Sequence, residues 1–169
     1  MAATTRICET NGTTGSPSET DSITNSNMGS IAAPNLVAAD YPIAAGTNSY
    51  EKYQRLEVVS MGGSSAVKNI KVWRTGSLSG SDAHVTNART SSYGGAETFT
   101  TPVNTTSTKA TQTMPSSEPG SANLGIGGSL TGQLTSAGKS DYLIHQIQVN
   151  SSTTAGASTT MNYKYEEVA

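Results

Sequence analysis

The sequence has few of the residues from which helices and large hydrophobic cores are built. Of its 169 residues, 34% are hydrophobic and 13% are charged, and it contains one tryptophan and one phenylalanine. Serine, threonine and glycine take their place, with 24, 25 and 17 copies. This composition disfavours helix along almost the whole chain. We therefore expect an all-β protein whose core is thin for its length.

Charge and cysteine are also scarce. Ten basic residues stand against twelve acidic ones, so the net charge is -2, and we expect no direct nucleic-acid partner. The single cysteine, Cys8, cannot form an internal disulfide. No apolar run approaches the roughly 18 residues that cross a membrane, and the first residues lack the apolar segment of a signal peptide. We therefore expect a chain that is made in the cytoplasm and has no membrane partner.

The chain is organised around Tyr50–Trp73, where two strand-like runs flank a Gly-Gly turn. Side chains alternate along both runs, because successive residues of a strand point to opposite faces. The residues that share the more apolar face are Gln54, Leu56 and Val58 in the first run, and Ile70 and Val72 in the second. The turn at Met61–Ser65 contains glycines that tolerate positive φ. We therefore predict a β-hairpin here.

Further strands are predicted along the rest of the chain. The segments with strand-like composition are Ala33–Ile43, Ala83–Thr86, Glu97–Thr101, Lys109–Thr113, Leu130–Leu134, Ser140–Asn150 and a closing strand from Met161 almost to Ala169. Two prolines in Ala33–Ile43 suit an edge strand, whereas the length of Ser140–Asn150 suggests a central one. Eight or nine strands without intervening helices predict a two-sheet β-sandwich of jelly-roll or immunoglobulin-like topology. We assign residues 32–169 to this domain.

Residues 1–31 show no strand or helix periodicity, and such a segment alone would be disordered. Ordering its backbone costs about 1–2 kcal/mol per residue, which is more than a few buried side chains return at about 1.5–3 kcal/mol each. We therefore expect an extended N-terminal arm that is held by strand addition to a sheet edge, on its own domain or on a neighbouring one. Deletion of the arm is expected to spare the fold.

Candidate catalytic residues are few. His84 and His145 could form a Ser/His/Asp triad with Asp82 or Asp141, but no serine lies in a nucleophile-elbow motif. No other residue is spaced so that it would complete a set of metal ligands with these histidines and aspartates. The glycines of Gly125–Leu130 lack the third glycine of a dinucleotide-binding motif and predict a turn. We expect no catalytic, metal or cofactor site and no enzyme activity, with His145 as a hydrogen-bonded core residue.

Trp73 is either a tryptophan in the second layer of the sandwich or an exposed contact residue, since tryptophan is enriched at interfaces. Tyr53 and Arg55 on the neighbouring run are expected to stack against it. A carbohydrate-binding sandwich would also use such an aromatic residue, although only Phe99 and seven tyrosines remain to build a sugar platform. The candidate interface residues are Ile7, Ile23, Met28, Tyr53, Arg55, Trp73 and Arg74.

The chain from Ala33 to Val168 resembles small structural proteins of tailed-bacteriophage virions. The resemblance lies in the stretches APNLVAADYPIAAGTNSYEKYQRLEVVSMGG, NIKVWRTG, TTPVNTTSTKATQTMPSSEPGSANLGIGG, SDYLIHQIQVNSSTTAG and YKYEEV. Residues 1–30 lie outside it, and it carries no catalytic residues.

The resemblance implies a β-rich capsid decoration (cement) protein, or else a component of head fibres or tails. A decoration protein would lie on the outer surface of the phage head, would bind the major capsid protein and would self-associate, with a trimer matching the sites where three capsomers meet. The alternative is a tail or head-fibre adhesin that binds host-surface carbohydrate. An acidic surface rich in Ser and Thr suits the solvent side of a shell that encloses DNA.

Overall fold

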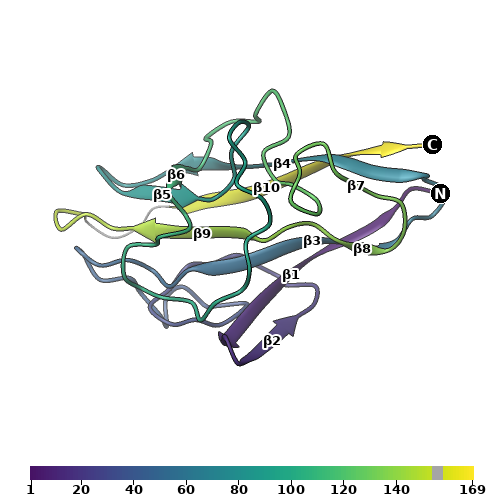
Figure 1. Ribbon diagram of the computed structural model, residues 1–169. Coiled ribbons are helices and arrows are strands. Elements are labelled where there is room, and N and C mark those ends of the chain that lie inside the picture. Colours follow the sequence, from purple (N-terminus) through teal and green to yellow (C-terminus); the bar gives the residue numbers. More distant parts are fainter. Residues whose placement is uncertain (154–157) are drawn as a thin grey trace.

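The protein is an all-β sandwich of two antiparallel sheets (Figure 1). The computed structural model describes residues 1–153 and 158–169. The strands are β1 (Thr4–Thr13), β2 (Ser16–Thr20), β3 (Lys52–Ser60), β4 (Ala66–Ser77), β5 (Ala83–Thr86), β6 (Gln112–Thr113), β7 (Gln133–Leu134), β8 (Gly138–Lys139), β9 (Leu143–Gln148) and β10 (Ser158–Val168). The predicted all-β, two-sheet fold is confirmed. No helix among the described residues is long and apolar enough to cross a membrane.

The two sheets differ in size. The larger sheet has the order β2-β1-β3-β9-β5-β6, with β8 paired to the end of β3, and the smaller has the order β10-β4-β7. Strand β9 lies between β3 and β5, so the central position predicted for Ser140–Asn150 is confirmed. The segments predicted at Ala83–Thr86 and from Met161 almost to Ala169 also form strands, β5 and β10.

The predicted hairpin between Tyr50 and Trp73 is wrong. Strand β3 pairs with β1, β8 and β9 in the larger sheet, whereas β4 pairs with β10 and β7 in the smaller one. The turn at Met61–Ser65 therefore carries the chain from one sheet to the other. The alternation of side chains was predicted correctly, but the two apolar faces meet across the sandwich instead of lying side by side, because each sheet needs the other to cover its apolar face.

The main core fills the space between the sheets. Its buried members are Leu56, Ile70, Val72, Ala88, Met114, Leu124, Ile126 and Leu143. A second, smaller cluster lies on the outer face of the larger sheet, where Tyr53 and Ile144 are covered by Phe99 and Ala110. The Tyr53 and Phe99 rings meet edge to face, with centroids 5.0 Å apart. A non-strand segment therefore supplies part of the packing.

Two predicted strands are replaced by irregular chain in this covering segment. Glu97–Thr101 contains no strand, and Lys109–Thr113 is reduced to β6, Gln112–Thr113. Side chains replace the ladder partners here: Ser107 N donates to Gln146 Oε1 at 3.1 Å, and Ala110 N donates to Ser107 Oγ at 2.8 Å. The side chains of Ser107 and Gln146 thus accept hydrogen bonds from backbone N–H groups that a neighbouring strand would otherwise accept.

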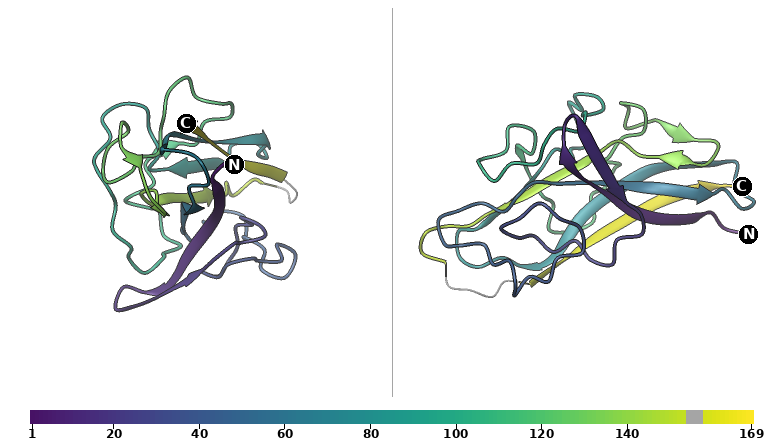
Figure 2. Two further views of the ribbon diagram at one scale, coloured as in Figure 1. Left: turned by 90° about the vertical axis from the view of Figure 1, so that its right-hand side faces the viewer. Right: turned by 90° about the horizontal axis from the view of Figure 1, so that it is seen from below.

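Residues 1–31 contain β1 and β2. Strand β1 pairs with β3 from Thr4 to Thr10, so the N-terminal strand adds to the larger sheet of its own domain. Strand β2 then folds back on β1 and forms the edge. Figure 1 shows β1 beside β3 with β2 on the far side of β1, and Figure 2 shows the two chain termini at the same end of the sandwich. Of the two expected forms of strand addition, the structure has the intramolecular one.

Residues 21–49 form a long connection, here called the 21–49 loop, between β2 and β3. The edge strand predicted at Ala33–Ile43 is wrong, because this segment consists of turns and bends. Asn35 has a φ of 53°, and Pro34 and Pro42 cannot donate to a ladder. The loop is closed on itself, since Ser30 N donates to Tyr41 O at 3.1 Å.

Candidate functional site

The predicted interface residues of the N-terminal segment point into the protein. Ile7 packs against the main core. Ile23 and Met28, together with Ile7, line a cavity of about 850 Å³ between β9, β10 and the 21–49 loop. These three residues therefore contribute to the interior and to the cavity wall.

Tyr53 and Arg55 belong to the outer face of the larger sheet. Tyr53 is 0% exposed, its hydroxyl lies 2.8 Å from Thr100 Oγ1, and burial raises the pKa of its phenol to about 12. The Arg55 guanidinium carbon lies 3.8 Å from the centre of the Tyr142 ring, in a cation–π contact. The predicted stacking of Tyr53 and Arg55 on Trp73 is wrong, because β3 and β4 belong to different sheets.

Trp73 and Arg74 lie on opposite faces of β4 in the smaller sheet. Trp73 is half-buried on the outer face and belongs to neither core cluster. Arg74 lies on the same inward-facing side of β4 as Ile70 and Val72, and its Nη1 donates to Gly76 O at 2.7 Å. The seven predicted residues therefore do not form one surface, and Trp73 is the member that faces outward from the smaller sheet.

A buried polar network crosses the inner face of the larger sheet. Glu9 accepts a hydrogen bond from Lys52 Nζ at 2.7 Å and another from Gln54 Nε2 at 2.9 Å. Gln54 Oε1 in turn accepts from Tyr163 Oη at 2.9 Å and lies 3.2 Å from His145 Nε2. Burial raises the pKa of Tyr163, which keeps its hydroxyl protonated and able to donate. An ion pair at one end therefore fixes the orientation of the Gln54 amide.

The orientation of Gln54 determines which ring nitrogens of the two histidines carry protons. Because a carboxylate only accepts, the Gln54 amide nitrogen faces Glu9 and its oxygen faces His145. His145 Nε2 is therefore protonated, and its Nδ1 accepts from His84 Nε2 at 2.9 Å. Burial lowers the pKa of His84 to about 4, helped by Arg74, and lowers that of His145 well below its usual value. Both rings are neutral near pH 7.

His84 completes the polar network beside the cavity. It is 3% exposed, and its Nδ1 has no hydrogen-bond partner among residues 1–153 and 158–169. His145 is fully buried and hydrogen-bonded, as predicted. The cavity wall thus combines two neutral imidazoles with the aliphatic side chains of Ile147, Val149 and Met161.

The histidines are not placed for nucleophilic catalysis. In the part of the chain that the structure describes, neither ring is hydrogen-bonded to a serine, threonine or cysteine. Asp82 accepts from Asn150 N at 2.7 Å, and Asp141 accepts from Tyr93 Oη at 2.9 Å, so neither carboxylate orients an imidazole. A catalytic triad needs a hydrogen bond between the nucleophile and the imidazole and another between the imidazole and a carboxylate. The geometry of the described residues provides neither of them.

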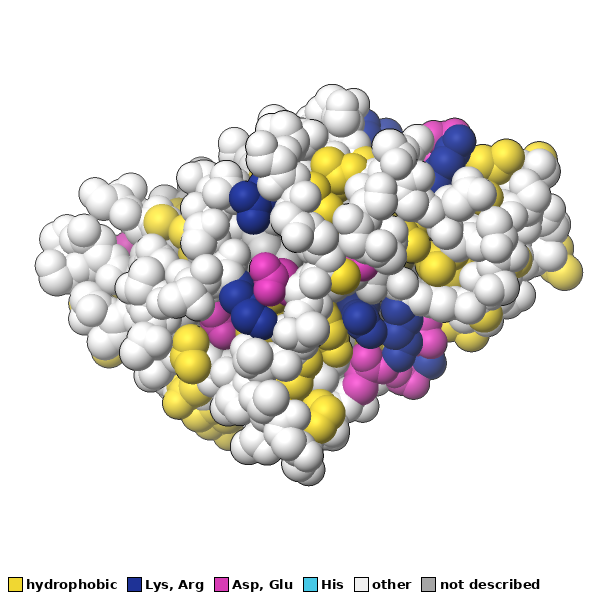
Figure 3. All heavy atoms as spheres, viewed as in Figure 1, with side chains coloured by type: hydrophobic (Ala, Val, Ile, Leu, Met, Phe, Trp, Pro, Cys, Tyr) yellow, Lys and Arg dark blue, Asp and Glu magenta, His cyan; other side chains and the backbone are white. Residues whose placement is uncertain are grey.

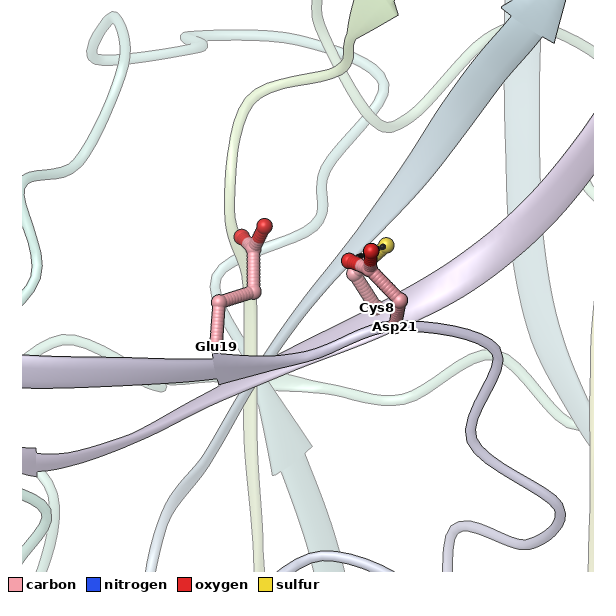
Figure 4. Close-up of side chains that lie close together, drawn as sticks. All are labelled: Cys8, Glu19 and Asp21. Carbon is pink, nitrogen blue, oxygen red and sulfur yellow. Dashed lines mark hydrogen bonds between the residues drawn. The ribbon is translucent and has the colours of Figure 1, made fainter.

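Cys8, Glu19 and Asp21 bring three potential metal-ligand atoms within 4.8 Å of one another on the outer face of β1 and β2 (Figure 4). Burial raises the pKa of the Cys8 thiol to about 12, and its hydrogen bond to Glu57 adds to the shift. The thiol is therefore protonated, and it donates to Glu57 Oε2 at 3.0 Å. Metal binding requires the thiolate instead.

The carboxylates of this cluster already have cationic partners. Arg6 lies 2.7 Å from Asp21 and 2.5 Å from Glu57, and Lys139 pairs with Glu19. The hydrogen bond from Arg6 lowers the pKa of Glu57. Figure 3 shows basic and acidic side chains gathered where β1, β2 and β8 meet. We interpret the cluster as an ion-pair network that holds β2 and the β8 turn to the sheet.

The 21–49 loop exposes three apolar side chains, together called the apolar patch, whose exposure was not predicted from the sequence. Ile31, Val37 and Tyr41 are 37%, 57% and 38% exposed. The signal in the sequence was a short apolar run interrupted by Pro34 and Pro42. Such a run fits an exposed loop as well as an edge strand.

The loop that carries the patch is tied down at several points. Asn27 Nδ2 donates to Leu36 O at 2.8 Å, Tyr50 N donates to Gly29 O at 3.0 Å, and Leu36 itself is 4% exposed. The apolar side chains are therefore presented on a loop of fixed shape.

Comparison of the chain with protein-family models, with curated proteins and with solved structures finds no match.

Proposed function

We propose that this chain is a structural protein of tailed-bacteriophage virions that binds the outer face of the head and stabilises contacts between capsomers. The observation that carries the proposal is the apolar patch of Ile31, Val37 and Tyr41 on the 21–49 loop. Exposed apolar side chains that are gathered on one loop among polar residues are a feature of interaction sites. The major capsid protein is the proposed partner.

The shape of the loop supports a role in binding. Its internal hydrogen bonds hold the patch in one conformation before a partner arrives, which lowers the entropy lost on association. The histidine network offers no nucleophile, and the Cys8 cluster offers no free carboxylate. We therefore propose that the protein acts by binding and not by catalysis, and that it associates into trimers where three capsomers meet.

We place the carbohydrate-binding adhesin second. Sugar-binding platforms need exposed aromatic rings, and Tyr41 is the one aromatic residue in the described chain that is exposed. The remaining aromatic side chains are buried or half-buried, which favours a protein partner over a sugar.

Quantitative mass spectrometry of purified particles tests the proposal. A decoration protein should be present in hundreds of copies per particle, and copy numbers of tens or fewer would rule it out. Sedimentation of stripped heads with added protein should then show loss of binding for Val37→Asp combined with Tyr41→Ser. The control is Val59→Asp, which changes a valine that is 44% exposed on β3 and should bind normally. Light scattering of the isolated protein tests the trimer.

A further inference from the structure

The smaller sheet has a long free edge. Strand β10 pairs with β4 along its length and is the last strand of the order β10-β4-β7. On its other side, no backbone hydrogen bond joins Thr159–Tyr163 to any other part of the described chain. An edge of this kind presents unpaired N–H and C=O groups to any strand that approaches it.

Only half of this edge is protected against strand addition. The second half of β10 carries Lys164, Glu166 and Glu167, together with a register shift between Lys164 and Glu166. Charges and bulges are the features that block edge pairing. The first half, Thr159–Tyr163, contains neither a charged residue nor a proline, so this half remains open to a partner.

The unprotected half of β10 borders the cavity. Thr159, Met161 and Tyr163 point inward and line it. Thr160 has the opposite parity on the strand and also lines it, so the cavity extends around the edge itself. Figure 2 shows the start of β10 and the 21–49 loop at the same end of the molecule.

The opposite wall of the cavity is the 21–49 loop. Ile23, Met28 and Ile43 provide aliphatic surface there, and no backbone hydrogen bond joins the described residues of the loop to β10. The loop therefore stands beside the edge without completing the sheet. The floor consists of the two neutral imidazoles and Ile147. Asp82 is the charged residue that lines the cavity, and it already accepts hydrogen bonds from Asn150 N and Thr153 Oγ1, so an acidic side chain would find no counter-ion among the described residues of the lining.

We propose that the edge of Thr159–Tyr163 and the adjoining cavity accept an extended, uncharged segment of a partner protein, which adds to β10 as a fourth strand. Its backbone pairs with β10, and every second side chain, apolar and of moderate size, enters the cavity between β10 and the 21–49 loop. Identification of the partner as the shell protein rests on the proposed function, whereas the strand-accepting site does not.

A second copy of this chain fits the same place less well than a single extended segment. Each copy carries its own 21–49 loop beside its β10 edge. Direct pairing of two β10 strands, roughly 4.8 Å apart, would place two such loops beside one ladder. A single extended segment has no such obstacle, because it needs only the space of the cavity and the length of the edge.

The test uses the whole protein and a synthetic seven-residue peptide with capped ends, in which valine alternates with threonine. Amide exchange followed by NMR should show the outward amides of Thr159–Tyr163 exchanging rapidly in the free protein and becoming protected as peptide is added. A peptide with aspartate in place of the central valine should not bind. If the alternating peptide at millimolar concentration leaves these amides unprotected, the proposal is wrong.

A matched pair of variants locates the site. Thr160→Lys places a charge on the free edge and should weaken peptide binding at least about tenfold, or about 1.4 kcal/mol. Thr75→Lys places the same charge on the ladder partner of Thr160 in β4 and should leave binding unchanged. Equal effects of the two variants would contradict the proposal.

If the protection of these amides grows with protein concentration in the absence of peptide, a second copy of the chain is the occupant. That result would overturn the proposal. The peptide measurement is independent of the copy number in virions. A negative peptide result therefore leaves the decoration function standing, and a low copy number leaves the strand-accepting site standing.

Discussion

Lys52 Nζ lies 2.7 Å from Glu9 Oε1, and the two side chains are 4% and 0% exposed, so β1 and β3 share an ion pair inside the protein. Removing one partner of a buried pair leaves the other charge without compensation. We therefore expect Glu9→Gln to lower the free energy of unfolding by about 3–5 kcal/mol, measured by urea denaturation.

Asp21→Asn is the control for this prediction. The Arg6–Asp21 pair is also formed by the N-terminal segment, but its side chains are 30% and 50% exposed, and exposed pairs contribute at most about 1 kcal/mol. Combining Glu9→Gln with Lys52→Met should restore most of the lost stability. A Glu9→Gln variant as stable as the original protein would show that the pair contributes nothing.

Deletion of residues 1–31 should unfold the protein. The sequence predicted that the deletion would spare the fold, but it removes β1, the partner of β3 along Thr4–Thr10, and leaves Lys52 buried without Glu9. The NMR spectrum of the deleted protein should lose its dispersion. Removal of Met1 and Ala2 alone, both exposed, should preserve it. A dispersed spectrum after the full deletion would show that residues 1–31 are an arm on which the fold does not depend.

Stability should fall as the pH drops from about 6.5 toward 4. In this range unfolded histidine, with a pKa near 6.5, takes up a proton that native His84, with a pKa of about 4, does not. The unfolded state is thereby favoured by up to about 3 kcal/mol. His145 shifts in the same direction. Urea denaturation at a series of pH values measures the slope.

The carboxylates change the free energy of unfolding at lower pH than the histidines do. Hydrogen bonds from Arg6 and Lys164 lower the pKa values of Glu57 and Glu118 below 4.5, so the stability they contribute is lost only below that value. A variant with both His84→Asn and His145→Asn should show little slope between pH 6.5 and 4.5. An unchanged slope in this variant would assign the effect to other groups.

Gly125→Ala should destabilise the protein by about 1–3 kcal/mol. A methyl group at this position would lie 2.5 Å from the Tyr93 ring and 2.6 Å from Asp141 Oδ2, two groups that are hydrogen-bonded to each other. Gly120→Ala is the control, because nothing lies within 4 Å of its added methyl. Thermal unfolding should separate the two variants clearly, and equal melting temperatures would contradict the prediction.

The strands that could be predicted are those in which apolar side chains alternate with other side chains over a long run. Leu143–Gln148 and Ser158–Val168 are of this kind. The pairing of β3 and β4 could not be predicted, because alternation gives the face of each residue and not the sheet to which a strand belongs. A Gly-Gly turn serves a hairpin and a crossing between sheets equally well.

The buried polar network was hidden for a different reason. Glu9 lies in a stretch of threonines and other polar residues that shows no apolar periodicity, and its role depends on Lys52 and Gln54 in another strand. Only the tertiary structure brings these groups together. His145 was predicted correctly as a core residue because its neighbours in β9 are apolar.

The two chain ends lie together at one end of the sandwich. Met1 O accepts from Gly63 N at 2.6 Å, and Ala3 N donates to Glu167. The 21–49 loop lies toward the opposite end in both Figure 1 and Figure 2. A second protein joined to either terminus would therefore project away from the apolar patch, so a particle coated through that patch would carry the joined protein on its outside.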